Sequence, residues 1–595
     1  MSVVLLEPLE SDREGEKMAS TVSEVEKNRL QRFFNKNRLV IFMISFIVIK
    51  QLLVIGIPLF AHAGAGHDDR LMINMADSLI NGEWLGEYSE KTLVKGLFFP
   101  FFLAVNHLFG IPYSLSIPGI YSIGCMIFVF GIKKLFPTEL PLFIIFLALL
   151  FNPISFADET FLRVYRNSLT ATQALIISGS MFAVYLNRFE KTWIQLLWAI
   201  CGGLGLASLW HTREDGIWII PLVLGVIVIT GIVIIARKER PLKERVKKSI
   251  ITVVPVVILI LSTIIISSIN YAYYGIYTTN ELNNSNFTKA IKIIYSVQPS
   301  EEVTRASVPR STMTKIYEVS PTLNHIKIEL EASLDRWSWY EKDAKVRQVE
   351  DGFFFWALRE AVANVGYYEN AVKADDFYKN VAQELEAGFA NGELERRPTM
   401  PSALMSPWRD EFSQELPIAF LKTVNYVVSF EAIKTSITDS IDDGKSGVLL
   451  FEEITNDQAR INGEPISLSD QIRIALLNGV TGIYRIIGAV AFIAALLAYG
   501  LISVFILMKK LRNKYELMDC WLVLSALLFS ACVLAGGVAY TDISAYVAIS
   551  YWYLAGAYPL IIAFNVIALY KITEIFVKVR YKKTKTEKEL RLREQ

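Results

Sequence analysis

The chain has 595 residues, of which 53% are hydrophobic and 12% aromatic, and its mean hydropathy is +0.36. These values exceed those of soluble domains and indicate a polytopic membrane protein. The net charge of +1 excludes a globally basic surface of the kind that binds nucleic acid. All four cysteines lie in apolar runs, which is typical of buried thiols rather than of a disulfide framework.

The N-terminal segment 1–37 is polar and has no apolar run followed by a cleavage site, so we expect a cytoplasmic tail and a retained first span. A membrane-crossing helix needs about 20 apolar residues. About ten segments meet that criterion, namely 38–60, 113–133, 138–153, 168–187, 192–210, 216–236, 249–269, 482–508, 517–538 and 545–572. The predicted fold class is therefore a polytopic α-helical membrane protein with additional surface helices.

One further apolar run, at 96–112, is short and contains a proline, an asparagine and a histidine, which favours a helix lying in the membrane interface. If this run does not cross, six clusters of lysine and arginine fall on one side, which the positive-inside rule makes cytoplasmic. We therefore expect an integral protein of the cell (inner) membrane. Both termini would be cytoplasmic, and the active face would be extracytoplasmic.

The spans divide the chain into four parts after the tail. A transmembrane module covers 38–269 and includes a first outer loop at 61–112. An extracytoplasmic α-rich domain is predicted over 270–480, with two helices joined by a turn and a short hairpin turning at Asn462-Gly463. C-terminal transmembrane helices follow at 481–575, and a basic cytoplasmic tail at 576–595.

The first outer loop begins "AHAGAGHDDRLMINMADSLINGEW" and combines two carboxylates, Asp68 and Asp69, with an amphipathic segment that should lie on the membrane surface. The carboxylates would stand at the start of that helix, where its dipole favours negative charge. This pattern is as typical of an ordinary acidic N-cap as of a catalytic pair. Because adjacent carboxylates raise one another's proton affinity, one of them could act as a general base.

Two other predicted outer loops also combine acids with arginines. The motif "FADETFLRVYRN" carries Asp158, Glu159, Arg163 and Arg166, and "HTREDG" carries His211, Arg213, Glu214 and Asp215. Guanidinium groups bind phosphate bidentately, whereas carboxylates can hold a cation or orient a hydroxyl. The alternative for the first motif is a plain i,i+4 salt bridge. His211 with its carboxylates could hold a divalent metal, although the spacing matches no zinc signature.

Lys95, in "TLVKGLFFPFF", opens the interfacial run, where a lone lysine is usually a snorkelling residue. The sequence contains no P-loop, no GxGxxG before a strand, no HExxH and no GxSxG. Nucleotide-driven transport and the common soluble hydrolase reactions are therefore not indicated.

The order of these parts resembles the polytopic glycosyltransferases of the C superfamily, among them protein O-mannosyltransferases and lipid A aminoarabinose transferases. The resemblance covers roughly residues 40–240. It rests on an acidic motif, a surface helix, a second surface helix and a crossing that ends in basic residues, here "HDDR", "INMADSLINGEW", "VKGLFFPFFLAVNHLFG" and "YSIGCMIFVFGIKKLF".

The resemblance implies an inverting enzyme whose sugar donor is carried on a polyprenyl phosphate in the outer leaflet. Asp68 or Asp69 would deprotonate the hydroxyl of a glycan, lipid or protein acceptor, with Asp158 and Glu159 as further catalytic candidates. The leaving lipid phosphate would need cations, for which Lys95, Arg163, Arg166 and Arg213 are the candidates. His211, Glu214 and Asp215 would complete the substrate-binding set.

Other classes remain open. A transporter or flippase of lipid-linked glycans would want charges near the bilayer midplane and internal repeats. A polysaccharide polymerase is chemically close to the transferase, with another glycan as acceptor. A purely structural or sensory membrane protein is the third class.

Overall fold

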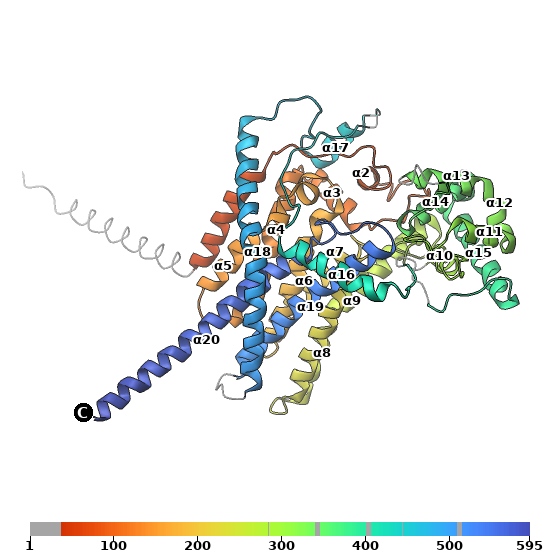
Figure 1. Ribbon diagram of the computed structural model, residues 1–595. Helices are drawn as coiled ribbons and strands as arrows, with labels where there is room; N and C mark the ends of the chain where they lie inside the picture. Colours follow the sequence, from red (N-terminus) through yellow and green to blue (C-terminus); the bar gives the residue numbers. More distant parts are fainter. Residues whose placement is uncertain are drawn as a thin grey trace, which may run out of the picture.

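The structure, a computed structural model, describes residues 37–594 except 284, 340–344, 400–405, 443, 445 and 509–513 (Figure 1). Apart from Asn37, the predicted N-terminal tail lies outside the described residues. Throughout the described part the chain is helical, and β-pairing is limited to isolated bridges. The predicted class, a polytopic α-helical membrane protein, is confirmed.

Nine described helices are long and apolar enough to cross a membrane. They are Asn37–Val54, α4 (Tyr113–Gly131), α6 (Thr170–Leu186), α7 (Thr192–Trp210), α8 (Ile220–Ala236), α9 (Leu242–Tyr274), α18 (Leu468–Leu507), α19 (Lys514–Ser544) and α20 (Ala557–Glu594). A tenth span results if α5 (Leu140–Leu150) is joined to the segment Pro153–Leu162, which bends away from it by 53°. This bent segment ends in a single π-helical turn, Asp158–Leu162, and such turns often mark functional sites.

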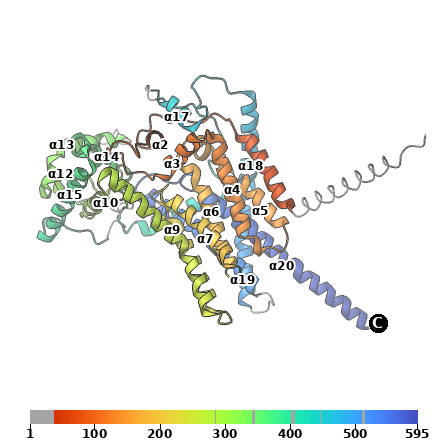
Figure 2. The same ribbon diagram turned by 180° about the vertical axis from the view of Figure 1, so that it is seen from behind.

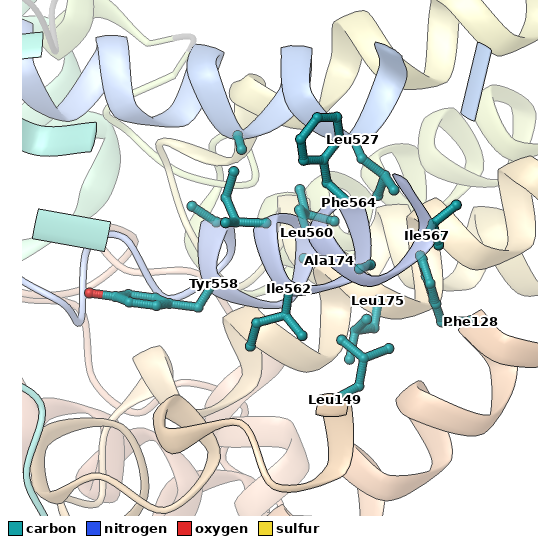
Figure 3. Close-up of a cluster of buried hydrophobic side chains, with 14 of the residues drawn as sticks. Phe128, Leu149, Ala174, Leu175, Leu527, Tyr558, Leu560, Ile562, Phe564 and Ile567 are labelled. Atoms are coloured by element: carbon teal, nitrogen blue, oxygen red, sulfur yellow. The ribbon is translucent and has the colours of Figure 1, made fainter. Parts of the chain in front are cut away.

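The core of the bundle forms where α4, α5, α6, α19 and α20 meet. Figure 3 shows side chains from these helices, including Phe128, Leu175, Leu527 and Phe564, packed against one another. The helices α4 and α6 approach each other closely, since a Cβ on Gly131 would lie 2.1 Å from the carbonyl oxygen of Gly179. Small residues let membrane helices approach in this way, so substitution at either glycine would push the helices apart.

Two shorter helices lie at the end of the bundle that carries residues 55–112, here called the loop end. They are α2 (Asp69–Ile80) and α3 (Phe98–Leu108), which pack against each other. The 11 residues of α3 span only about 16 Å, roughly half the thickness of a bilayer core. The length of α3 supports the prediction that 96–112 does not cross, which stays a prediction.

The chain between α9 and α18 separates into two groups of helices. The first group shares a core of its own and lies to one side of the bundle in Figures 1 and 2; we call it the α-rich domain. It comprises α10 (Asn286–Tyr295), α11 (Arg310–Val319), α12 (Pro321–His325), α13 (Lys327–Trp337), α14 (Asp351–Asn364) and α15 (Ala371–Asn391). The second group packs elsewhere: α16 (Phe412–Val428) lies against α19, and α17 (Gly447–Thr455) lies against α2 and α3.

Two sequence predictions are wrong. The hairpin at Asn462-Gly463 is absent, because the apolar residues before it form α17, which buries Phe451 and Ile454. The last span begins at Ala557 rather than at 545, because residues 545–556 form an aromatic loop. The carboxylate of Asp542 accepts hydrogen bonds from the backbone of that loop at Ala548 and Ile549, which holds it out of the helix.

Asp351 begins α14 and joins the α-rich domain to the bundle. The residue is 6% exposed, and its carboxylate accepts hydrogen bonds from Ser307 and Ser406. The hydroxyl oxygen of Ser406 also lies 3.0 Å from the carbonyl oxygen of Ser544 at the end of α19. Burial raises the pKa of Asp351 to about 6 against the opposing hydrogen bonds of the two serines. Between pH 3.8 and about 6, the folded chain therefore keeps a proton on Asp351 that the unfolded chain releases.

We predict that Asp351→Asn stabilises the protein in a pH-dependent way. The raised pKa of Asp351 contributes its full stabilisation only below pH 3.8, the ordinary pKa of this carboxyl. The free energy of unfolding of the wild type therefore falls as the pH rises from 3.8 to about 6. Asparagine does not ionise, so its advantage should grow over that interval to about 2–3 kcal/mol and stay constant above it. Thermal unfolding of both proteins at about pH 5 and about pH 7.5 measures the difference. An equal difference at both pH values would contradict the prediction.

The proposed orientation is tested by labelling with a membrane-impermeant maleimide. Exposed Lys238 and Lys379 are separated by α9, so a cysteine at each should react from opposite faces. In a chain from which the four native cysteines have been removed, we expect intact cells to be labelled at position 379 and not at 238. The reverse pattern would invert the topology, and labelling of both would contradict a single crossing by α9.

Candidate active site

The loop that carries the acidic pair is held at its start by an extended segment, residues 59–63. Leu59, Phe60 and His62 form isolated parallel bridges to Ala459, Arg163 and Ile441 respectively. The backbone N–H of Phe60 donates to the carbonyl of Leu162 at 2.8 Å. Three segments that are distant in sequence therefore position the residues that follow.

Asp68 lies at the centre of a polar network. Its Oδ1 accepts hydrogen bonds from Lys95 Nζ at 2.7 Å and from the hydroxyl of Tyr165 at 2.8 Å. The same hydroxyl accepts from Arg166 Nε at 3.2 Å. No hydrogen bond to Oδ2 occurs among the residues that the structure describes, and the side chain is 47% exposed. Asp68 therefore presents one fixed oxygen to the protein and one oxygen to solvent.

Asp68 occupies the N-cap position of α2, but its side chain makes no capping hydrogen bond. The interpretation as an ordinary acidic N-cap therefore does not account for its contacts. Burial raises the pKa of this carboxyl, but the charge and hydrogen bond of Lys95 outweigh it and hold the pKa well below its ordinary value. The expected effect of one carboxylate on the other is therefore present only at Asp69, whose pKa the charge of Asp68 helps to raise, whereas at Asp68 Lys95 dominates.

Asp69 has a different environment. It is fully buried, and the guanidinium of Arg163 donates to both of its oxygens, from Nε at 2.7 Å and from NH2 at 2.6 Å. Arg163 also donates to Glu159 at 2.8 Å, so the predicted i,i+4 pair exists as well. Burial raises the pKa of Asp69, and the hydrogen bonds from Arg163 act in the opposite direction. This geometry suits a structural ion pair and leaves the carboxylate no access to a substrate.

Arg166 connects the Asp68 network to the second arginine-rich loop. Its NH1 donates to both oxygens of Glu214, at 2.7 and 2.6 Å, and to the carbonyl of Thr212. Glu214 also accepts from the backbone N–H of Gly96 at 3.2 Å. A Cβ on Gly96 would meet the carbonyl oxygen of His211 at 2.2 Å, so this approach requires glycine beside Lys95.

Arg213 forms a further pair nearby. It donates to both oxygens of Asp215, at 2.7 and 2.6 Å, and to the side-chain oxygen of Asn167. Burial raises the pKa of Asp215, but Arg213 prevails and lowers it. His211 lies elsewhere, with its Nε2 2.9 Å from Ser262 on α9, and burial lowers its pKa to about 4. The structure therefore does not bring His211 into the network.

Asp158 is likewise held apart from Asp68. Its carboxylate accepts hydrogen bonds from the hydroxyls of Tyr551 and Ser436, and its backbone N–H donates to the carbonyl of Lys434. These contacts anchor the π-helical turn to the aromatic loop 545–556. The described part of the chain contains no group of three His, Cys, Asp or Glu side chains placed to hold a metal ion.

Sequence reasoning missed Tyr165, whose hydroxyl joins Lys95, Asp68 and Arg166. Its ring also lies beneath two guanidinium groups, 5.1 Å from that of Arg163 and 5.6 Å from that of Arg166. The only signal for it was its place between these arginines in "LRVYRN". The arrangement as a whole offers an ionised, half-exposed carboxylate beside buried cations, which suits proton abstraction next to a developing negative charge.

Comparison with known proteins adds only a distant structural likeness. A scan against protein-family models and a search of curated proteins found no match. The chain is similar to crystal structures of ArnT from Cupriavidus metallidurans, one in the apo state and one bound to undecaprenyl phosphate. The identities are 13% and 12% and the TM-scores 0.31 and 0.29, over 89% and 85% of this chain and 78% of each ArnT chain. At these values the likeness assigns no reaction and no residue to the present chain.

Proposed function

We propose that the protein is a membrane glycosyltransferase that moves a sugar from a polyprenyl-phosphate donor to an acceptor hydroxyl at the loop end of the bundle, on the extracytoplasmic face. The reaction class follows the resemblance of residues 40–240 to the C-superfamily glycosyltransferases. The choice of residues follows the contacts described above. Asp68 is the general base, and Lys95 and Arg166 are the cations nearest to it.

The observation that carries this proposal is the state of Asp68. Its Oδ1 is fixed by Lys95 and Tyr165, and its side chain is half exposed beside them. A carboxylate that is ionised at neutral pH and oriented through one oxygen can accept a proton on the other from an attacking hydroxyl. Inversion at the anomeric carbon then needs only this base on one side of the sugar and the leaving phosphate on the other.

The leaving phosphate gains negative charge as the bond to the sugar breaks. Lys95 is 10% exposed and carries its charge at 2.7 Å from Asp68, so it can interact with both the base and a phosphate. Arg166, Arg163 and Arg213 already donate to Glu214, Asp69 and Asp215. Because each of these charges is balanced by a carboxylate, Lys95 would make the main contribution to stabilising the phosphate.

We predict opposite outcomes for the two carboxylates. Asp68→Asn should leave the protein folded but lower the rate of sugar transfer by about 10²–10⁴-fold, because an amide cannot accept the proton. Asp69→Asn should instead lower stability, by about 3–5 kcal/mol at most, because it removes one of the two carboxylates that compensate the charge of Arg163 and leaves only Glu159. Transfer from a synthetic polyprenyl-phosphate sugar and the unfolding temperature separate the two effects. Full activity of Asp68→Asn in well-folded protein would refute the assignment.

A second prediction concerns Lys95→Gln. The ammonium lowers the pKa of Asp68 while burial raises it, so removing the ammonium should move that pKa upward. Because the base must be ionised, the acidic limb of the kcat/KM profile should shift to higher pH, with a lower plateau from the lost cation. Glu83→Gln, which removes an exposed charge on the same loop away from Asp68, is the matched control. A profile that keeps its acidic limb in place would show that Lys95 does not set the ionisation of the base.

A further inference from the structure

Four aromatic side chains of the α-rich domain gather beside the candidate active site. Trp337, at the end of α13, stacks on Trp356 of α14 with 6.4 Å between ring centroids and 11° between planes. It also stacks on Phe353 at 6.1 Å and 28°, and Phe355 contacts Trp356 at 4.9 Å. Trp356 is buried, whereas the other three are half-buried. We call these four residues the aromatic cluster.

The aromatic cluster touches the residues on either side of the proposed base. His67, which precedes Asp68, sets its imidazole edge against Trp337 at 5.0 Å and against Trp356 at 4.8 Å. The ammonium of Lys95 lies 5.8 Å from the ring centroid of Trp356 and 2.7 Å from Asp68. The cluster is therefore connected to the proposed proton acceptor through His67 and Lys95.

Charged groups surround these rings. The indole N–H of Trp337 donates to Glu360 at 2.5 Å, and Arg336 donates to the same carboxylate at 2.8 Å. Glu90 and Lys91, which form a pair at 3.9 Å, lie close enough to His67 to influence its charge. The surface next to Asp68 thus combines flat apolar rings with hydrogen-bonding groups at their edges.

We propose, on the basis of the function proposed above, that the aromatic cluster binds the acceptor and that the acceptor is a carbohydrate. A pyranose ring has one face of C–H groups, which the electron-rich face of an indole attracts, and a rim of hydroxyls. The carboxylates of Glu360 and Glu90 and the ammonium of Lys91 can accept from and donate to such hydroxyls. One hydroxyl of the bound sugar then faces Asp68.

The position of the cluster favours the acceptor over the donor. A donor carried on a membrane lipid reaches Asp68 from the bundle, where α4, α6 and α7 lie. The aromatic cluster approaches from the α-rich domain, outside the bundle (Figure 1). An acyl chain would also fill an apolar surface, but it has no hydroxyl groups to bond to the carboxylates and ammonium at the edges of the rings.

The test measures binding without turnover. The probes are methyl glycosides of common hexoses, pentoses and N-acetylhexosamines, titrated against the full chain and followed by saturation-transfer NMR. Nanodiscs replace maltoside detergents, whose headgroups are themselves sugars. Trp337→Leu keeps apolar bulk but removes the aromatic face, and Trp337→Phe restores one. Trp408→Leu is the matched control, since Trp408 stacks on Tyr540 at 6.1 Å elsewhere in the chain.

We expect at least one glycoside to bind, with affinity weakened about threefold to tenfold by Trp337→Leu, mostly restored by Trp337→Phe and unchanged in Trp408→Leu. If Trp337→Leu does not fold, Phe353→Leu should weaken binding in its place. The inference is overturned if no glycoside binds the native chain, or if the leucine variants bind as tightly as the native chain.

Failure of this inference and failure of the proposed function give different results. If glycosides bind as expected but Asp68→Asn transfers sugar at the native rate, the proposed function fails while the binding site stands. If transfer is then observed, Trp337→Leu should raise the KM for the acceptor and leave the KM for the lipid donor alone. A change confined to the donor KM would overturn the acceptor assignment while leaving the transferase intact.

Discussion

Charge neutralisation between distant segments is the constraint on which the loop end of this protein depends. Three arginines that carry little or no exposed surface are paired with carboxylates far away in the sequence: Arg163 with Asp69, Arg166 with Glu214, and Arg359 with Glu281. Breaking a buried pair leaves an uncompensated charge, at a cost of about 3–5 kcal/mol. Each pair therefore fixes the relative position of two loops more firmly than apolar contacts alone would.

This constraint also shapes the chemistry. Because the arginines are already paired with carboxylates, the charges around Asp68 nearly cancel and do not form a positively charged surface. Lys95 differs from them, since its partner is the half-exposed Asp68. A phosphate could compete for that lysine without exposing a buried charge. Charge can thus be redistributed at this point, while the rest of the network stays fixed.

Most of the architecture could be predicted because apolar length and the distribution of lysine and arginine are local properties of the sequence. The acidic and arginine-rich motifs were visible for the same reason. Their pairing was not, because nothing in "HDDR" says that Asp69 turns inward to Arg163 while Asp68 turns to Lys95. Tyr165 was missed because a single tyrosine carries no signal until its partners are known.

The two errors have a similar origin. The segment before Asn462-Gly463 alternates enough to favour a hairpin, but contact with α2 and α3 stabilises a helix there. Residues 545–556 are apolar enough to extend the last span, yet the Asp542 carboxylate and the Tyr551–Asp158 contact hold them as a loop. In both cases a tertiary interaction overrides the local preference.

The bridges that hold residues 59–63 have a consequence for the way the protein is made. Their partners include Ile441 and Ala459, which the ribosome adds almost 400 residues after the residues with which they pair. The hydrogen bond between Asp158 and Tyr551 likewise joins residues that are 393 positions apart. The first loop must therefore remain without its final contacts through most of translation. A chain that stops before residue 441 would carry every acidic residue of the site and still lack two of the three bridges that hold residues 59–63.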